Sequence, residues 1–180
     1  MSSTPCQAST PSPITRRLAN RIRTRGKRLR LLVGEELVAI HHVGSTAVPG
    51  LAAKPIIGLI PIARDIDRID DCTPLLVKAG YKAWGENGIA GRRFFTKDGG
   101  EYRTHNLPVF AEGDPAVERH LALCAYLRHA AGARCEYAAL KRAVYAQHPA
   151  DIAAYNDGKD AWIKRTEPVT IDWYRRQFVK

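Results

Sequence analysis

Hydrophobic residues recur along this chain with two different periods, which predict helices and strands in turn. Apolar residues at helical spacing, separated by arginines, predict a helix over residues 13–33. Nearly continuous apolar runs predict strands over 37–43 and 56–62, and the second is apolar enough to be covered on both faces. Between them, the Gly-, Ser-, Thr- and Pro-rich segment 44–55 predicts a loop with a short helical turn at 51–53.

The remainder of the chain predicts more strands and then a series of helices. Three strands follow a helix that begins near Asp65 and ends at Gly80, and we expect them over 81–84, 92–96 and 102–110. Helical segments are then expected from Asp114 to Leu127 and over 135–147, 151–155, 159–164 and 171–179. This order predicts an α+β (α/β) fold, in which helices pack on a small mixed sheet.

Composition indicates a globular protein. Of the 180 residues, 45% are hydrophobic and 26% are charged, which excludes a disordered chain, a collagen and a coiled-coil rod. Residues 1–12 are rich in Ser, Thr and Pro and predict a disordered tail, followed by a single domain over 13–180. No stretch approaches the ~20 apolar residues of a membrane span. Four cysteines without zinc-site spacing, and no secretory apolar segment, predict free thiols and a cytoplasmic location.

The formal charge of +10 is concentrated near one end of the chain. Residues 1–30 hold eight basic residues and no acidic one, whereas the rest is nearly balanced. Such a run can attract nucleic acid or an acidic partner, and it is also typical of a solvated helix face. Both interpretations remain open at this point.

The loop after the first strand carries the clearest chemical signal. There the strand runs into Gly44-Ser45-Thr46, where glycine allows close backbone approach and the two hydroxyls stand beside free backbone amides. This combination can hold phosphate oxygens without a Walker lysine motif. A simple strand-to-helix turn has the same local sequence.

Several blocks in a fixed order resemble the GrpB family of the nucleotidyltransferase superfamily. The similarity covers about residues 30–165, and its blocks lie at 42–57, 88–95, 103–109, 118–121, 136–141 and 155–159. The resemblance implies a nucleotidyltransferase-like mixed sheet flanked by helices, with the Gly-Ser turn facing a nucleotide triphosphate. It also implies ATP or another nucleotide, with Mg²⁺, as the cofactor.

The chain departs from this family pattern where the metal would be held. The resemblance implies an Asp directly after the Lys-Pro-Ile-Ile run, and this chain has Gly58 there. It also implies His at the positions of Asn106 and Pro108 and an acidic residue at His41. Because glycine offers no side-chain ligand, we expect the anion-holding half of the site to persist without its metal-binding half.

The candidate site therefore combines an anion pocket with a possible acid–base pair, and we name no metal ligand. The candidate anion-binding residues are Gly44, Ser45, Thr46, Lys54, Arg92, Arg93, Arg103 and Lys159. His42 and His105 are the candidate catalytic residues, because the resemblance implies that His42 lies next to the Gly-Ser turn and that His105 lies on a strand beside it. Structural histidines bonded within the sheet are the alternative.

Three functional hypotheses follow. The leading one is a GrpB-like protein that binds a nucleotide or another anionic small molecule, with transferase chemistry lost or repurposed. The second is a non-catalytic module whose basic residues 13–30 contact nucleic acid or an acidic partner. The third is an active Mg²⁺-dependent nucleotidyltransferase with a relocated carboxylate such as Glu86 or Glu101.

Overall fold

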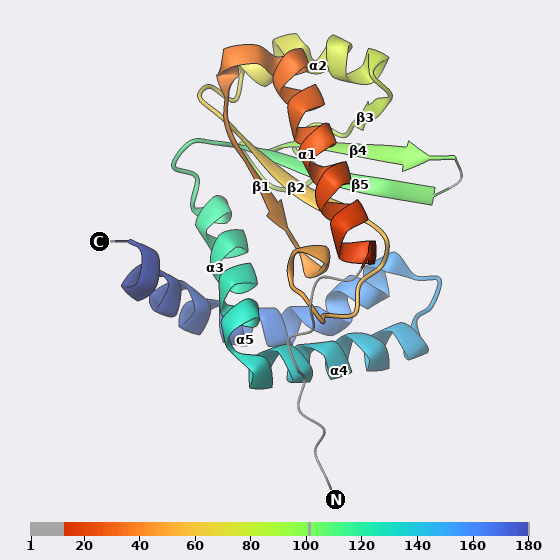
Figure 1. Cartoon of the computed structure of the whole chain (residues 1–180), viewed down its shortest axis with the longest axis vertical. Coiled ribbons are helices and arrows are strands. Elements are labelled where there is room, and N and C mark those ends of the chain that lie inside the picture. Colours follow the sequence, from red (N-terminus) through yellow and green to blue (C-terminus); the bar gives the residue numbers. More distant parts are fainter. Residues whose placement is uncertain (1–12, 101, 180) are drawn as a thin grey trace, which may run out of the picture. The chain divides into compact units, whose positions relative to one another are not determined.

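The computed structural model describes residues 13–100 and 102–179, with side chains from Leu18 onward. Contacts divide the described residues into two compact units, whose elements are labelled in Figure 1. The sheet unit comprises 13–44 and 55–117, and the helical unit comprises 45–54 and 118–179. The tail expected over 1–12 lies outside the described residues, and a single domain over 13–180 stays a prediction.

The sheet unit is built on one mixed five-stranded sheet in the order β1-β2-β5-β4-β3. Its central pair, β2 and β5, is parallel, and the other neighbouring pairs are antiparallel. The strands are β1 (Leu37–Val43), β2 (Ile57–Ala63), β3 (Tyr81–Ala83), β4 (Arg93–Gly99) and β5 (Tyr102–Ala111). This arrangement confirms the expected mixed sheet with helices.

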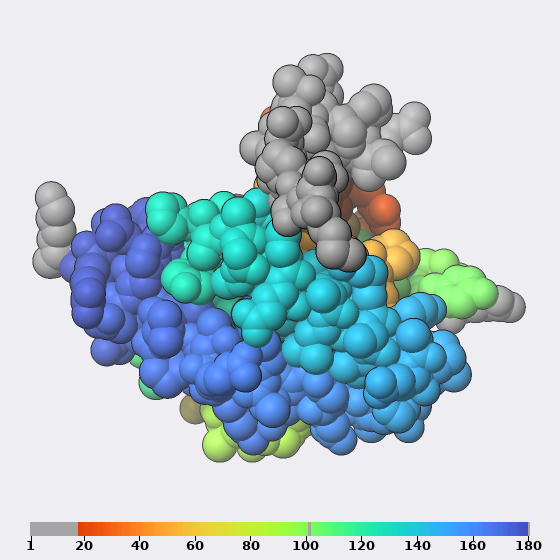
Figure 2. Space-filling model, turned by 90° about the horizontal axis from the view of Figure 1, so that it is seen from below, coloured from red at the N-terminus to blue at the C-terminus, as the bar shows by residue number. Residues whose placement is uncertain are grey.

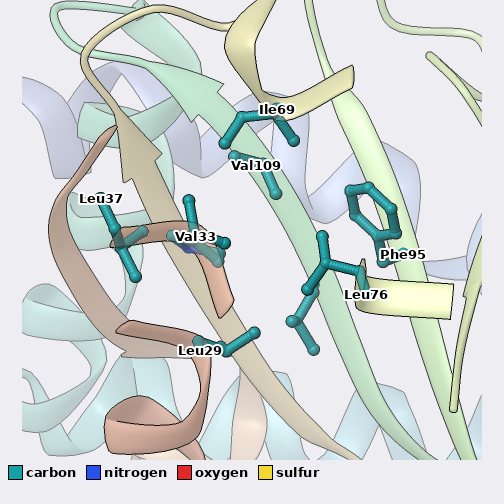
Figure 3. A pocket seen from close by; sticks show the side chains of 9 residues that line it. Leu29, Val33, Leu37, Ile69, Leu76, Phe95 and Val109 are labelled. Atoms are coloured by element: carbon teal, nitrogen blue, oxygen red, sulfur yellow. The ribbon is translucent and has the colours of Figure 1, made fainter. Parts of the chain in front are cut away.

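Helices α1 (Pro13–Val33) and α2 (Arg68–Lys78) cover one face of this sheet (Figure 1). Gly34 ends α1 because its φ of +70° is a left-handed conformation that glycine adopts without strain, and the short helix η1 (Gly34–Glu36) follows. Figure 3 shows side chains such as Leu29, Leu76 and Phe95 pointing toward one another between the helices and the strands. The lining is entirely apolar, so this hollow belongs to the core.

The helical unit contains most of α3 (Pro115–His129) together with α4 (Ala131–Gln147) and α5 (Ile152–Phe178). Figure 2 shows α4 and α5 as adjoining surfaces, and they pack through Tyr137 and Trp162, whose rings stack with centroids 4.4 Å apart. The Trp162 indole also donates to Glu136 Oε1 at 2.8 Å. Among the described residues, no helix combines the length and apolarity that crossing a membrane requires.

Two local expectations are wrong. The helical pieces expected after residue 150 are one continuous helix, α5, which runs through Pro168. A single helix places Tyr155, Trp162 and Thr170 on one buried side, and this packing outweighs the backbone bond that proline removes. The helical turn expected at 51–53 lies instead at η2 (Ser45–Ala47), directly after Gly44.

Candidate anion site in the helical unit

The turn after β1 is held in place by a buried lysine. Lys141 of α4 donates from Nζ to Ser45 Oγ at 2.6 Å and to the Ala52 carbonyl, so one ammonium group joins both ends of the loop. Arg128 fixes the middle of the loop by donating to the Ala47 carbonyl at 2.8 Å. The Ser45 hydroxyl thus lies directly beside a positive charge.

Lys141 is 6% exposed, which is unusual for lysine. Burial, together with the positive charges of Lys159 and Lys54, lowers the pKa of Lys141 to about 8. Its two hydrogen-bond acceptors are neutral oxygens, which solvate the ammonium group without cancelling its charge. The structure therefore holds a partly desolvated cation beside the Ser45 turn.

Two further lysines, Lys54 and Lys159, converge on the ring of Tyr155. Their Nζ atoms lie 4.5 Å and 4.0 Å from its centroid, within the range of cation–π attraction. Lys54 also lies 5.2 Å from the Tyr145 ring centroid. Burial and the neighbouring Lys54 lower the pKa of Lys159 to about 8. We call Lys54, Lys141 and Lys159 the lysine cluster.

No lysine of the cluster has a carboxylate at ion-pair distance within the described part of the chain. Four acidic residues on α3 to α5 pair with other cations: Glu118 with Arg175, Glu136 with Arg165, Asp160 with Lys164 and Glu167 with Arg119. Like charges brought together raise one another's energy, as the lowered pKa values of Lys141 and Lys159 indicate. An anion that bound there would relieve this repulsion.

The structure thus gathers Ser45, Lys54 and Lys159 from the candidate set, and Thr46 lies half-buried in the same turn. Lys141 of the cluster, and Tyr155 beside it, are not among the candidates. Lys141 does have a signal in the sequence, because it occupies the stripe of Tyr137 and Val144, at i, i+4 and i+7 along α4. A lysine at an apolar position of a helix indicates a buried charge with a specific role.

The other candidate cations lie in the sheet unit, where protein groups engage two of them. Arg93 donates to Asp70 at 2.7 Å and 2.8 Å and to Asp67 at 3.1 Å. Arg92 donates to the backbone carbonyls of Glu86 and Asn87, at 3.0 Å and 2.5 Å. Arg93 therefore joins β4 to the start of α2, and Arg92 fastens the segment before β4. Arg103 is exposed on β5, where its backbone faces that of Asp98.

The expectation that His42 and His105 lie on neighbouring strands is wrong. His42 is on β1 and His105 is on β5, and β2 runs between them. Two inter-strand spacings separate these strands by about 10 Å, so the two rings do not share a proton directly. The separation arises because β2 pairs with β1 on one edge and with β5 on the other.

His105 itself is buried and neutral. The Thr104 hydroxyl donates to the Lys97 carbonyl at 3.0 Å, so the His105 Nδ1–H is the donor in its 2.8 Å contact with Thr104 Oγ1. Nε2 then carries the lone pair and has no partner among the described residues. Burial and the charges of Arg25, Arg21 and Lys97 lower the pKa of His105 to about 4. The catalytic role of His105 stays a prediction.

The described residues do not suit the Mg²⁺ ion that the family resemblance implies. Gly58 lies on β2 opposite Val43 and Asn106 and offers no side-chain oxygen. Within the described ranges, no three His, Cys, Asp or Glu side chains are grouped to hold a metal ion. Of the two carboxylates considered as replacements at the metal site, Glu86 accepts a hydrogen bond from the Gly91 amide at 2.7 Å, and Glu101 lies outside the described residues.

Comparisons with known proteins identify the family of the chain. Residues 12–168 match the family described as GrpB protein. The UPF0157 protein YqkA of Bacillus subtilis is 46% identical over 147 residues, which cover 82% of this chain and 43% of YqkA. The UPF0157 protein PA4798 of Pseudomonas aeruginosa is 39% identical over 71% of this chain and 53% of its own length. The chain thus spans about half the length of these curated relatives.

Solved structures agree with this relationship. The crystal structure of the conserved protein GrpB from Enterococcus faecalis superimposes with a TM-score of 0.81 at 32% identity, covering 87% of this chain and 93% of that one. A structure of Cid1, described as an RNA terminal uridylyl transferase, matches with a TM-score of 0.48 at 16% identity over 69% of this chain and 39% of Cid1. A similarity as distant as the second carries no functional conclusion.

Proposed function

Since this chain belongs to the GrpB protein family, we propose that it binds a nucleotide or another phosphate-bearing small molecule at the Ser45 turn and the lysine cluster. The phosphate groups would lie against the Nζ atoms of Lys54, Lys141 and Lys159. The hydroxyls and backbone of the Gly44-Ser45-Thr46 turn would complete the set of donors.

One observation carries this proposal: Lys141 is nearly fully buried, it is flanked by two more lysines, and its hydrogen-bond acceptors are uncharged. Burying an ammonium group without a counter-ion is unfavourable, and bringing three ammonium groups together does not stabilise the fold. A bound phosphate would supply the missing negative charge. It would also raise the lowered pKa values of Lys141 and Lys159 toward that of a free lysine.

The chemistry that these residues support is the binding and orientation of phosphates. Ser45 Oγ, held by Lys141 at 2.6 Å, is the hydroxyl nearest to the positive charge. Lys54 and Lys159 are held at the Tyr155 ring and neutralise phosphate charge without a metal ion. We therefore propose that the site has kept phosphate recognition, while its transferase chemistry is lost or repurposed.

Isothermal titration with ATP and with inorganic triphosphate, each with and without Mg²⁺, tests the proposal. We expect wild-type protein to bind both anions without Mg²⁺, and Lys141→Met to lose at least tenfold in affinity. Lys164→Met is the matched control, since Lys164 is an exposed lysine on α5 that pairs with Asp160 at 2.6 Å. Absence of binding by folded wild-type protein, or equal losses in both variants, would refute the proposal.

A further inference from the structure

A second group of cations lies in the sheet unit and takes no part in the lysine cluster. Helix α1 carries Arg21, Arg25 and Arg28 at positions i, i+4 and i+7, so these side chains share one side of the helix. That side borders the buried face, because Ile22 and Leu29 lie on the adjoining stripe and pack into the core. Arg23 and Lys27 leave the helix on the opposite side.

A row of side chains on the sheet lies under this side of α1. In the register of the strands, Tyr81 of β3 is opposite Lys97 of β4, and Lys97 is opposite His105 of β5. Directly opposed residues on neighbouring strands project from the same face. Arg25 reaches the row from above, with its guanidinium carbon 6.0 Å from the centroid of the Tyr81 ring. Lys97 Nζ lies 4.6 Å from the same centroid.

The electrostatics of this row show how closely the arginines approach it. Burial and the charges of Arg25 and Arg28 lower the pKa of Lys97. The neutral His105, 1% exposed, experiences Arg25, Arg21 and Lys97 together. His105 Nε2 and the Tyr81 hydroxyl are also buried without hydrogen-bond partners among the described residues. The row therefore contributes polar groups and one cation, but no negative charge.

The sheet unit pairs an arginine with carboxylates where the fold needs it, as the three contacts of Arg93 with Asp70 and Asp67 show. In the part of the chain that the structure describes, no carboxylate forms an ion pair with Arg21, Arg25, Arg28 or Lys97. The exposed Arg21 and Arg28 lie beside the half-buried Arg25 and Lys97, whose ammonium group donates to the Ala79 carbonyl. Together they form a group of cations without a counter-charge, which is complementary to a ligand that brings several negative charges at once.

We infer that this arginine stripe, consisting of Arg21, Arg25 and Arg28 of α1 with Lys97 of β4, binds the phosphate backbone of a nucleic-acid duplex. From Arg21 to Arg28 the helix rises about 10 Å, which matches about three phosphates along one strand. Guanidinium groups bind phosphate oxygens bidentately. The stripe presents no exposed aromatic ring for stacking on unpaired bases, since Tyr81 is 2% exposed and covered by cations.

The experiment measures the affinity of the full chain for a short fluorescein-labelled DNA duplex by anisotropy at several salt concentrations. The test variant is Arg21→Gln/Arg28→Gln, which leaves Arg25 against Tyr81. The control is Arg23→Gln/Lys27→Gln, which removes the same charge from the opposite side of α1. All four substituted side chains are exposed, so both variants should fold.

We expect the stripe variant to lose at least tenfold in affinity and the control to lose less than threefold. The slope of log K against log salt should fall by about 1.8 for the stripe variant, since each lost phosphate contact removes about 0.9. Lys141→Met should bind the duplex as the wild type does, because that residue belongs to the lysine cluster. Equal losses in the two double variants, stronger binding of the unpaired single strand, or equal competition by polyglutamate would overturn the inference.

Discussion

Replacing Lys141 with methionine should change how the stability of the protein depends on pH. Methionine has a similar length and no charge, so the substitution removes the buried ammonium group and leaves the space filled. It also removes the donor to Ser45 Oγ and to the Ala52 carbonyl. Removing the buried charge stabilises the native state, whereas losing the two hydrogen bonds destabilises it. The net change in the free energy of unfolding depends on whether Lys141 is protonated.

The magnitude follows from the pKa of Lys141, which burial and the neighbouring lysines lower from 10.5 to about 8. Below pH 8 the native and unfolded states both hold the proton, and the native state carries the full penalty of the buried charge. Between pH 8 and pH 10.5 the unfolded state binds more protons than the native state, so the free energy of unfolding rises with pH. At 1.36 kcal/mol per unit, the rise amounts to about 3 kcal/mol.

The unpaired acceptors left by methionine destabilise the variant by about 1–3 kcal/mol at every pH. Near pH 7 this loss is offset by removal of the charge, so the variant and the wild type should differ by less than about 2 kcal/mol. At pH 10.5 the wild type should be the more stable protein. The difference between their unfolding free energies therefore rises from pH 8 upward.

Urea denaturation followed by tryptophan fluorescence, at a series of pH values, measures this difference directly. Lys164→Met is the control, because the hydrogen bond with Asp160 raises the pKa of that exposed lysine. Any contribution that Lys164 makes to the free energy of unfolding therefore decreases, rather than increases, as the pH rises through its pKa. A difference between wild type and Lys141→Met that stays flat or falls from pH 8 to pH 10.5 would refute the reasoning.

Three further predictions concern the site and the packing. At pH 8, inorganic triphosphate should bind with uptake of protons, because Lys141 and Lys159 have pKa values of about 8; titrations in buffers of different ionisation enthalpy measure this, and heats independent of the buffer would contradict it. Gly58→Ala should lower the unfolding free energy by about 1–3 kcal/mol, since its Cβ would lie 2.9 Å from the Val43 carbonyl oxygen; an unchanged melting temperature would show that β1 yields. Gly158→Ala should destabilise by a similar amount, about 1–3 kcal/mol, because its Cβ would lie 2.6 Å from Val144 Cγ1, and Val144→Ala should restore the stability in the double variant.

Local sequence was sufficient for the sheet because each strand carries its own signal. The strands expected over 37–43, 56–62, 92–96 and 102–110 lie close to the observed bounds of β1, β2, β4 and β5. Local sequence does not predict the order of the strands in the sheet, since that order depends on which strand edges pair with one another. The placement of β2 between His42 and His105 follows from that pairing, and no short-range pattern shows it. The continuity of α5 through Pro168 likewise depends on packing against other helices.

The candidate site was half predictable for a related reason. Ser45, Lys141 and Lys159 all lie in blocks that resemble the GrpB family, but the sequence does not show that Lys141 joins the turn to the helices, 96 positions after Ser45. Lys141 matters because it is buried without a counter-ion in the described part of the chain, and the absence of a counter-ion is not visible in the local sequence. Since no lysine of the cluster has a carboxylate at ion-pair distance among the described residues, the cluster's own cations supply the positive charge that phosphates need, and the lysines should dominate binding whether or not Mg²⁺ is present.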